Sequence, residues 1–153
     1  MNLILWRHAE AEDANVRGDM ARELTKRGRK QSKQMAHWLD AHLEGEWRIL
    51  VSPAIRTLQT VEALERNFDA SDALAPGAGP EKVLRAAGWP ESGNVLVVGH
   101  QPTLGEVASA LLGAPDGGVS IRKGAIWWFE SREREGKMEA IVKTVLEPAE
   151  AED

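Results

Sequence analysis

The sequence predicts a three-layer α/β/α sandwich with a mainly parallel sheet and a C-terminal antiparallel edge hairpin. Short apolar runs alternate with segments of helical periodicity, which is typical of helices that cover both faces of a parallel sheet. The run NVLVVG at 94–99 is continuous and rich in valine, as expected for a strand buried on both faces. Two final runs, 125–130 and 139–146, flank a charged turn at 131–137 and predict the hairpin.

The N-terminal part of the chain alternates strands with helices. The apolar run at 2–6 predicts a buried strand. Thr25 is placed to cap a helix that should reach about Leu43, although Gly28 in its first turn weakens this pattern. Residues 48–52 then predict a second strand.

A second helix is predicted directly after that strand. Ser52 followed by Pro53 fits an N-cap residue with proline at the first helical position. Apolar residues at helical spacing continue to about Phe68, so we expect the helix to end there.

The C-terminal part adds smaller elements around the valine-rich strand. Residues 70–74 predict a short strand, and 81–87 a short helix. Thr103 and Glu106 have the spacing of a capping box, which predicts a helix that ends near Leu112.

The length of 153 residues corresponds to one domain, which we place at 1–147, followed by an acidic tail at 148–153. No apolar run is long enough to span a membrane, and the N-terminus lacks the pattern of a signal peptide. We therefore expect a cytoplasmic protein without a membrane partner.

Composition excludes several classes of function. The chain has no cysteine, which removes disulfides, thiolate metal sites and a cysteine nucleophile. The net charge of −5 argues against a nucleic-acid partner, since such proteins normally carry a basic footprint. One local exception is the basic segment Arg22–Lys33, which we interpret as a solvated helix face. A docking surface for an acidic phosphoprotein is the alternative interpretation.

Polar residues that suit phosphate follow three of the predicted strands. Arg7 and His8 end the first, residues 52–56 follow the second, and His100 follows the valine-rich strand. Ligands of parallel α/β sheets gather at the carboxyl ends of strands, so these residues should converge. A single histidine at a strand end is more often structural, and only this convergence favours a site.

The residue types fit phosphoryl transfer. Arginine presents a permanently charged fork that binds phosphoryl oxygens in a bidentate manner, which suits Arg7 and Arg56. A neutral imidazole such as that of His8 is a competent nucleophile near pH 7 and would form a covalent phosphohistidine. A second, protonated histidine at position 100 would donate to the phosphoryl oxygens.

Four segments in order also carry a family resemblance: LILWRHAEAE at 3–12, ELTKRG at 23–28, SPAIRTLQTVE at 52–62 and VVGHQPTLGE at 97–106. With them the chain resembles the histidine phosphatase superfamily, which is related to phosphoglycerate mutases, and within it the compact SixA-type phosphohistidine phosphatases. The resemblance covers about two thirds of the chain.

The resemblance implies that His8 is the nucleophile and that Arg7, Arg56 and His100 bind phosphate. It also implies a phosphatase that acts on phosphohistidine of a phosphorelay or phosphotransfer protein, with no cofactor and no metal. Ala9 departs from the family pattern, which has glycine at this position. That change matters only if the backbone there has a positive φ.

A second departure concerns the proton donor. Gln101 stands where the acid-phosphatase branch of the family has an aspartate directly after the second histidine. Cleavage of a phosphate ester benefits from such an acid, whereas the P–N bond of phosphohistidine breaks without much help. The sequence therefore favours a phosphoramidate substrate. Glu10, by its closeness to His8, is the first candidate donor, before Asp13 and Glu81.

Three alternatives remain open from the sequence. The same His8 intermediate could serve a phosphomonoesterase that acts on a small metabolite. A metal hydrolase could use His8, Glu10 and His100, and activity that survives EDTA would remove it. A non-catalytic phosphate-binding module is the third alternative.

Overall fold

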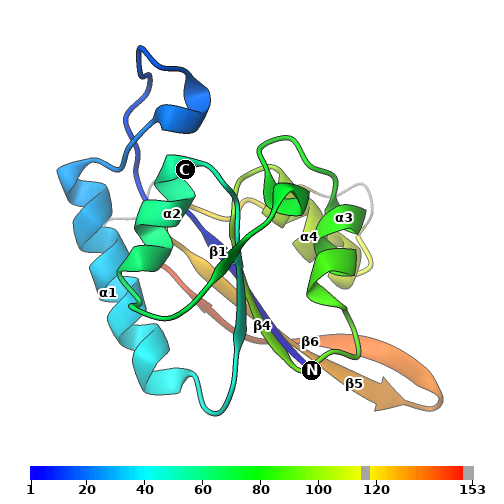
Figure 1. Ribbon diagram of the computed structural model, residues 1–153. Coiled ribbons are helices and arrows are strands. Elements are labelled where there is room, and N and C mark those ends of the chain that lie inside the picture. The colour runs from blue at the N-terminus through cyan, green and yellow to red at the C-terminus, as the bar shows by residue number, and fades with distance from the viewer. Residues whose placement is uncertain (115–117, 150–153) are drawn as a thin grey trace.

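The computed structural model describes residues 1–114 and 118–149, and a single six-stranded sheet forms its centre. The strands lie in the order β3-β2-β4-β1-β5-β6 (Figure 1). In chain order they are β1 (Asn2–Arg7), β2 (Arg48–Val51), β3 (Asp69–Ala70), β4 (Asn94–Gly99), β5 (Ile126–Arg134) and β6 (Lys137–Leu146).

The sheet is parallel on one side of β1 and antiparallel on the other. β3, β2, β4 and β1 pair in parallel, whereas β5 pairs antiparallel with both β1 and β6. β6 is the edge strand, so the predicted sandwich with a C-terminal antiparallel edge hairpin is confirmed. The predicted strand at 94–99 is found with the same bounds.

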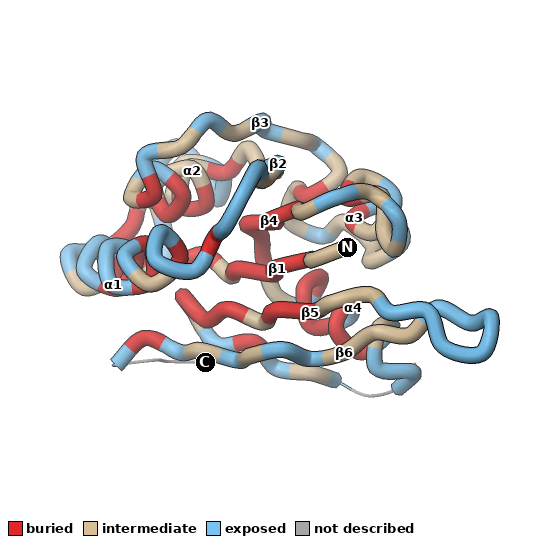
Figure 2. The backbone as a smooth tube through the Cα atoms, turned by 90° about the horizontal axis from the view of Figure 1, so that it is seen from below, coloured by how far each residue is buried: buried red, intermediate tan, exposed pale blue. Residues whose placement is uncertain are grey.

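Helices cover both faces of the sheet, as Figures 1 and 2 show. The α-helices are α1 (Lys26–His42), α2 (Ile55–Glu62), α3 (Pro80–Ala87) and α4 (Thr103–Leu111). α1 and α2 pack on one face, and α3 and α4 on the other. The chain moves outward from β1 to β3 and then returns to β4, and right-handed crossovers in opposite directions place their helices on opposite faces.

Alternate side chains of each central strand enter two apolar clusters. Leu3 and Leu5 of β1 pack with α3 and α4, whereas Ile4 and Trp6 pack with α1 and α2. All four side chains are fully buried. Burial of each stabilises the fold by roughly 1.5–3 kcal/mol. A strand with two covered faces explains why the apolar runs of the sequence are continuous.

The start of α1 confirms the predicted cap. The Thr25 side chain accepts a hydrogen bond from the Gly28 amide at 3.0 Å, and the helix begins at Lys26. Glycine lowers the helix propensity at position 28, but the structure requires it there. A Cβ at this position would overlap the carbonyl oxygen of Glu10. The first turn of α1 thus packs directly against the segment that follows β1.

The predicted start of α2 is wrong. Ala54, not Ser52, is the N-cap, and Pro53 precedes the helix, which begins at Ile55. The Ser52 amide donates to the Val98 carbonyl at 3.0 Å, which extends the pairing of β2 with β4 by one residue. This sheet bond fixes Ser52 directly after β2, two residues before the N-cap, so its side chain does not cap α2.

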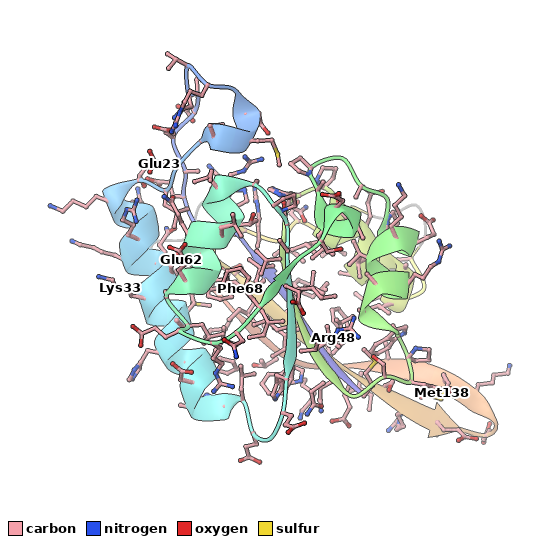
Figure 3. All side chains as sticks on the ribbon, in the orientation of Figure 1. Glu23, Lys33, Arg48, Glu62, Phe68 and Met138 are labelled. Atoms are coloured by element: carbon pink, nitrogen blue, oxygen red, sulfur yellow. The ribbon has the colours of Figure 1, made fainter. Side chains whose placement is uncertain are left out.

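The predicted end of α2 is also wrong, because the helix ends at Glu62 (Figure 3). The amides of Leu64 and Glu65 bond to carbonyls three residues earlier, and Glu65 then adopts a φ of 53°. A tightened last turn followed by a left-handed residue ends the helix. Phe68 still packs against the core, so its helical spacing predicted burial but not helix.

The capping box predicted for α4 is absent. Thr103 is the first residue of the helix, and Pro102 is its N-cap. The Thr103 hydroxyl donates to the Ala78 carbonyl at 2.7 Å, which ties the loop before α3 to α4 instead of bonding within its own helix.

The strand predicted at 70–74 is shorter and lies slightly earlier. β3 ends at Ala70, and a 3₁₀ turn at Asp72–Leu74 follows it. The Ser71 side chain accepts a hydrogen bond from the Ala73 amide at 3.3 Å, so a local turn replaces further strand pairing.

The hairpin between β5 and β6 is longer than predicted, and its turn is tighter. Only Glu135 and Gly136 connect the strands, with φ values of 53° and 78°. Two successive residues with positive φ match the type I′ turn that the twist of a hairpin favours. Met138 lies near the tip, where the hairpin projects from the rest of the molecule (Figure 3).

The last described residues contact α1. Pro148 is buried, and the Ala149 amide donates to the side-chain carbonyl of Gln34 at 3.1 Å. The remainder of the predicted acidic tail, 150–153, lies outside the described residues. Among the residues that are described, no helix is long and apolar enough to cross a membrane.

Candidate active site

The carboxyl ends of β1, β2 and β4 meet at one edge of the sheet. The His8 amide donates to the Gly99 carbonyl at 3.1 Å, which continues the pairing of β1 with β4. Ser52 and His100 directly follow β2 and β4. The register of the sheet therefore fixes the backbone of all three polar residues.

The two histidines form a buried pair. The ring centroids of His8 and His100 lie 5.4 Å apart with an angle of 58° between the planes. His8 is 6% exposed and His100 is 4% exposed. Two buried imidazoles this close are suited to contact a common small group.

The hydrogen bonds of His8 determine which nitrogen is available. Nδ1 lies 2.7 Å from the carbonyl oxygen of Ala9. A carbonyl only accepts hydrogen bonds, so Nδ1 carries the proton in the neutral ring and Nε2 holds the free lone pair. Burial is the main reason that the pKa of His8 falls to about 3, so the ring is neutral near pH 7.

The pKa of His100 is also low, at about 4, because the ring is buried and Arg56 lies close. The sequence suggested a protonated second histidine, whereas here the ring is neutral near pH 7. Burial disfavours the charged imidazolium, and the neighbouring guanidinium groups of Arg56 and Arg7 add to this effect.

Two arginines bring positive charge to the same edge. Arg56 lies in the first turn of α2, is 4% exposed, and donates to the Asp19 carbonyl at 2.9 Å. Its other terminal nitrogen lies 3.2 Å from the Asp19 carboxylate. Arg7, the last residue of β1, donates to the Ile121 carbonyl at 2.8 Å. Backbone carbonyls thus orient both guanidinium groups.

Asp19 is a site residue that sequence reasoning missed. It belongs to a 3₁₀ turn at Asp19–Ala21, and its carboxylate contacts Arg22 at 3.0 Å as well as Arg56. The hydrogen bond from Arg22, with the charge of Arg56, holds the pKa of this carboxyl below its usual range. No periodicity or motif in the sequence marks Asp19, because a single 3₁₀ turn within the loop after β1 is too short to show one.

Ala9 causes no backbone strain. Among the described residues other than glycine, positive φ values occur at Glu65 and Glu135 and not at Ala9. The Ala9 amide donates to the Thr60 hydroxyl at 3.1 Å, and that hydroxyl donates to the Arg56 carbonyl at 2.7 Å. Alanine therefore fits here, and the contact couples the segment after His8 to α2.

The three predicted candidates for the proton donor have other surroundings. The Glu10 carboxylate accepts a hydrogen bond from the Thr25 hydroxyl at 2.8 Å and lies 3.7 Å from the Arg27 guanidinium. These contacts hold it at the start of α1. Asp13 and Glu81 are exposed. In the described part of the chain, no three His, Cys, Asp or Glu side chains gather as metal ligands would.

Known proteins resemble this chain in sequence and in fold. The family model of the histidine phosphatase superfamily (branch 1) matches residues 3–76. A phosphohistidine phosphatase SixA homolog from Haemophilus influenzae is 33% identical over an alignment of 132 residues that covers 74% of this chain and 78% of that protein. The chain belongs to the histidine phosphatase superfamily.

Further relatives show that the chain is similar to the SixA proteins. Phosphohistidine phosphatase SixA of Escherichia coli is 30% identical over 120 residues, covering 72% of this chain and 74% of that protein. A solved structure of the protein histidine phosphatase SixA complexed with tungstate superposes with a TM-score of 0.80 at 27% identity, covering 97% of each chain. This histidine phosphatase is therefore a hydrolase of the SixA type, and its fold is that of the superfamily.

Proposed function

We propose that this histidine phosphatase hydrolyses phosphohistidine on a phosphorelay or phosphotransfer protein through a covalent phosphohistidine at His8. The buried pair of His8 and His100, with the free lone pair of His8 on Nε2, is the observation that carries the proposal. Proteins of the SixA type among the relatives support the choice of substrate.

In the first step His8 Nε2 attacks the phosphorus while the bond from phosphorus to the substrate nitrogen breaks. The His8 ring gains positive charge as it is phosphorylated, and the bond from Nδ1–H to the Ala9 carbonyl stabilises that charge. Water then attacks the phosphorus, and Nε2 leaves with its lone pair. The enzyme thus returns to the neutral tautomer from which it started.

Arg7 and Arg56 would bind the phosphoryl oxygens. Catalysis of phosphoryl transfer depends mainly on positioning and on charge stabilisation, and guanidinium groups supply both. Arg56 is nearly inaccessible to solvent, so its charge is weakly screened and acts strongly on a bound anion. His100 would complete the set of donors.

The carboxylate beside the candidate site favours a substrate with a good leaving group. The Asp19 carboxyl contacts Arg56, and its low pKa keeps it ionised near pH 7. An ionised carboxylate does not protonate the leaving alkoxide of an ester. A phosphoimidazole protonated on its second nitrogen needs no such help, since it releases neutral imidazole. The ionised state of this carboxylate supports phosphohistidine over a phosphate ester.

The test compares the rates at which one enzyme preparation hydrolyses a phosphohistidine protein and sugar phosphates. We expect a phosphohistidine protein to be turned over with a kcat/KM at least about 100-fold above that of sugar phosphates, a difference of about 2.7 kcal/mol in transition-state stabilisation. His8→Ala should abolish both activities, whereas His37→Ala, on the exposed side of α1, should retain them. Equal or better turnover of sugar phosphates would instead identify a small-molecule phosphomonoesterase that uses the same nucleophile.

A further inference from the structure

The hydroxyl of Ser52 contacts the second histidine of the site. Ser52 is completely buried at the end of β2, and its Oγ lies 2.7 Å from His100 Nε2. The proposed phosphoryl transfer uses His100 but assigns nothing to Ser52.

The direction of this hydrogen bond follows from the other contact of the hydroxyl. Ser52 Oγ accepts a hydrogen bond from the Ala54 amide at 3.3 Å. The Ser52 hydroxyl has one proton to donate. Within the described residues, His100 Nε2 is the acceptor that lies in hydrogen-bond distance of it. A buried hydroxyl proton without an acceptor is unfavourable. Ser52 therefore donates, and Nε2 is the unprotonated nitrogen of the neutral ring.

The proton of the neutral His100 ring must then reside on Nδ1. That atom is buried and has no hydrogen-bond partner among the described residues. The Arg56 and Arg7 guanidinium groups act on this ring, and guanidinium groups cannot accept a hydrogen bond from it. An unused N–H donor beside two cations is suited to an anionic oxygen.

We propose that Ser52 is a positioning residue that holds neutral His100 in the tautomer protonated at Nδ1, so that Nδ1–H donates to a phosphoryl oxygen. The proposal rests on the proposed function, in which a phosphoryl group occupies this site. Free neutral histidine prefers the proton on Nε2, and that tautomer would direct a lone pair of Nδ1 at the phosphoryl oxygen. Ser52 thereby converts a repulsive contact into an attractive one.

Nitrogen NMR of the protein labelled with ¹⁵N-histidine tests the tautomer directly, without phosphate, at pH 7. We expect His100 to show a protonated Nδ1 and an unprotonated Nε2. The signals are assigned by their loss in His100→Gln, which leaves His8, His37 and His42. A protonated Nε2 of His100 in the unmodified protein overturns the proposal, whatever the variants do.

Ser52→Ala provides the kinetic test. Loss of one donor to a transition-state oxygen commonly costs 100-fold or more, so we expect kcat to fall by about 10- to 100-fold, with KM changed less than about threefold. In the NMR spectrum the proton should move to Nε2. Ser52→Thr keeps the hydroxyl and should restore the Nδ1 proton and most of kcat.

Ser32→Ala is the matched control. Ser32 on α1 is 1% exposed, and its hydroxyl donates to the Gly28 carbonyl at 3.0 Å, away from both site histidines. It should retain kcat within about twofold and the wild-type tautomer of His100. Equal losses of kcat in Ser52→Ala and Ser32→Ala, with an unchanged tautomer, reject a positioning role. Failure of the proposed function gives a different result. In that case the unmodified enzyme does not hydrolyse phosphohistidine, although His100 has the expected tautomer.

Discussion

The buried Arg56 guanidinium is bound to a carboxylate of its own chain. Its two terminal nitrogens contact the carbonyl and the carboxylate of Asp19, so a phosphoryl group must share or replace these contacts. The Asp19 side chain is 57% exposed, which limits the strength of the pair. At the scale of single residues, we therefore expect Asp19 to influence how strongly the site binds an anion.

Replacement of Asp19 by asparagine should strengthen anion binding. Asp19→Asn removes a negative charge that repels the anion, and because the Asp19 carboxylate is exposed to solvent, its effect should be roughly 0.2–1 kcal/mol. We therefore expect the Kd for tungstate, measured by calorimetry, to fall about two- to fivefold. Glu23→Gln, which removes a half-buried carboxylate that contacts Arg29 and Gln59 and not Arg56, should change it little. Weaker tungstate binding by Asp19→Asn would show that the carboxylate helps to form the pocket.

Sequence reasoning at this scale identified side chains but not their partners. Residue type and strand-end position were enough to select His8, Arg56 and His100. The interpretation of Ser52 as a helix cap missed its bond to His100, because that bond depends on the neighbouring position of β2 and β4. Asp19 and the Ala9 carbonyl act through loop geometry and through the backbone, and neither is visible in a pattern of side chains.

At the scale of elements, α1 depends on a close approach to the segment after β1. A methyl group on Gly28 would overlap the Glu10 carbonyl oxygen, which is backbone and cannot move independently. Gly28→Ala should therefore destabilise the protein by about 1–3 kcal/mol, despite the higher helix propensity of alanine. Denaturant unfolding measures this difference.

Gly118→Ala serves as the control for that prediction. A Cβ at Gly118 would meet nothing within 4 Å, so its free energy of unfolding should stay within about 0.5 kcal/mol of the unmodified protein. A Gly28→Ala variant as stable as this control would mean that α1 is free to shift away from Glu10.

The exposed side of α1 carries the basic segment that the sequence singled out. Lys26, Arg27 and Lys30 line a shallow groove of about 490 Å³, and Lys33 points outward one turn further along (Figure 3). A solvated face remains the simpler interpretation. Docking of an acidic phosphoprotein is the alternative, and it would be independent of the chemistry at His8.

Charge reversal separates these interpretations. If α1 docks the substrate protein, the double variant Lys26→Glu with Lys30→Glu should raise KM for a phosphohistidine protein about tenfold at low salt. Hydrolysis of a small phosphoramidate should be unchanged. Reversal of Lys82 and Lys137, which lie on α3 and on the hairpin, is the control. An unchanged KM for the protein substrate supports the solvated face.

At the scale of the whole molecule, the order of the strands brings the residues of the candidate site together. β4 lies between β1 and β2, so three segments distant in the sequence end side by side. Apolar periodicity and the strand-end rule predicted this convergence. The starts of α2 and α4 were predicted less well than the end of α4, because sheet pairing of Ser52 and a bond from Thr103 to another loop outweigh the local caps.

The two buried histidines also give the fold a dependence on pH. Their pKa values, about 3 for His8 and about 4 for His100, lie below the ordinary value of 6.5, so the unfolded chain binds protons first as pH falls. The free energy of unfolding should therefore decrease from about pH 6.5 to pH 4, by up to about 1.4 kcal/mol per pH unit for each histidine.

Urea unfolding at several pH values checks this dependence. His100→Gln should reduce the slope between pH 6.5 and pH 4, because one of the two groups is removed. An identical slope in the variant and in the unmodified protein would mean that His100 is accessible to protons in the folded state.

The central claim is that His8 carries the phosphoryl group during turnover, and rapid quenching of the enzyme with a phosphohistidine protein tests it most directly. The account predicts an acid-labile, base-stable phosphate on His8, attached to Nε2 and absent from His8→Ala, which should be inactive. Full hydrolytic activity in His8→Ala, or a phosphate trapped on a different residue, would contradict it.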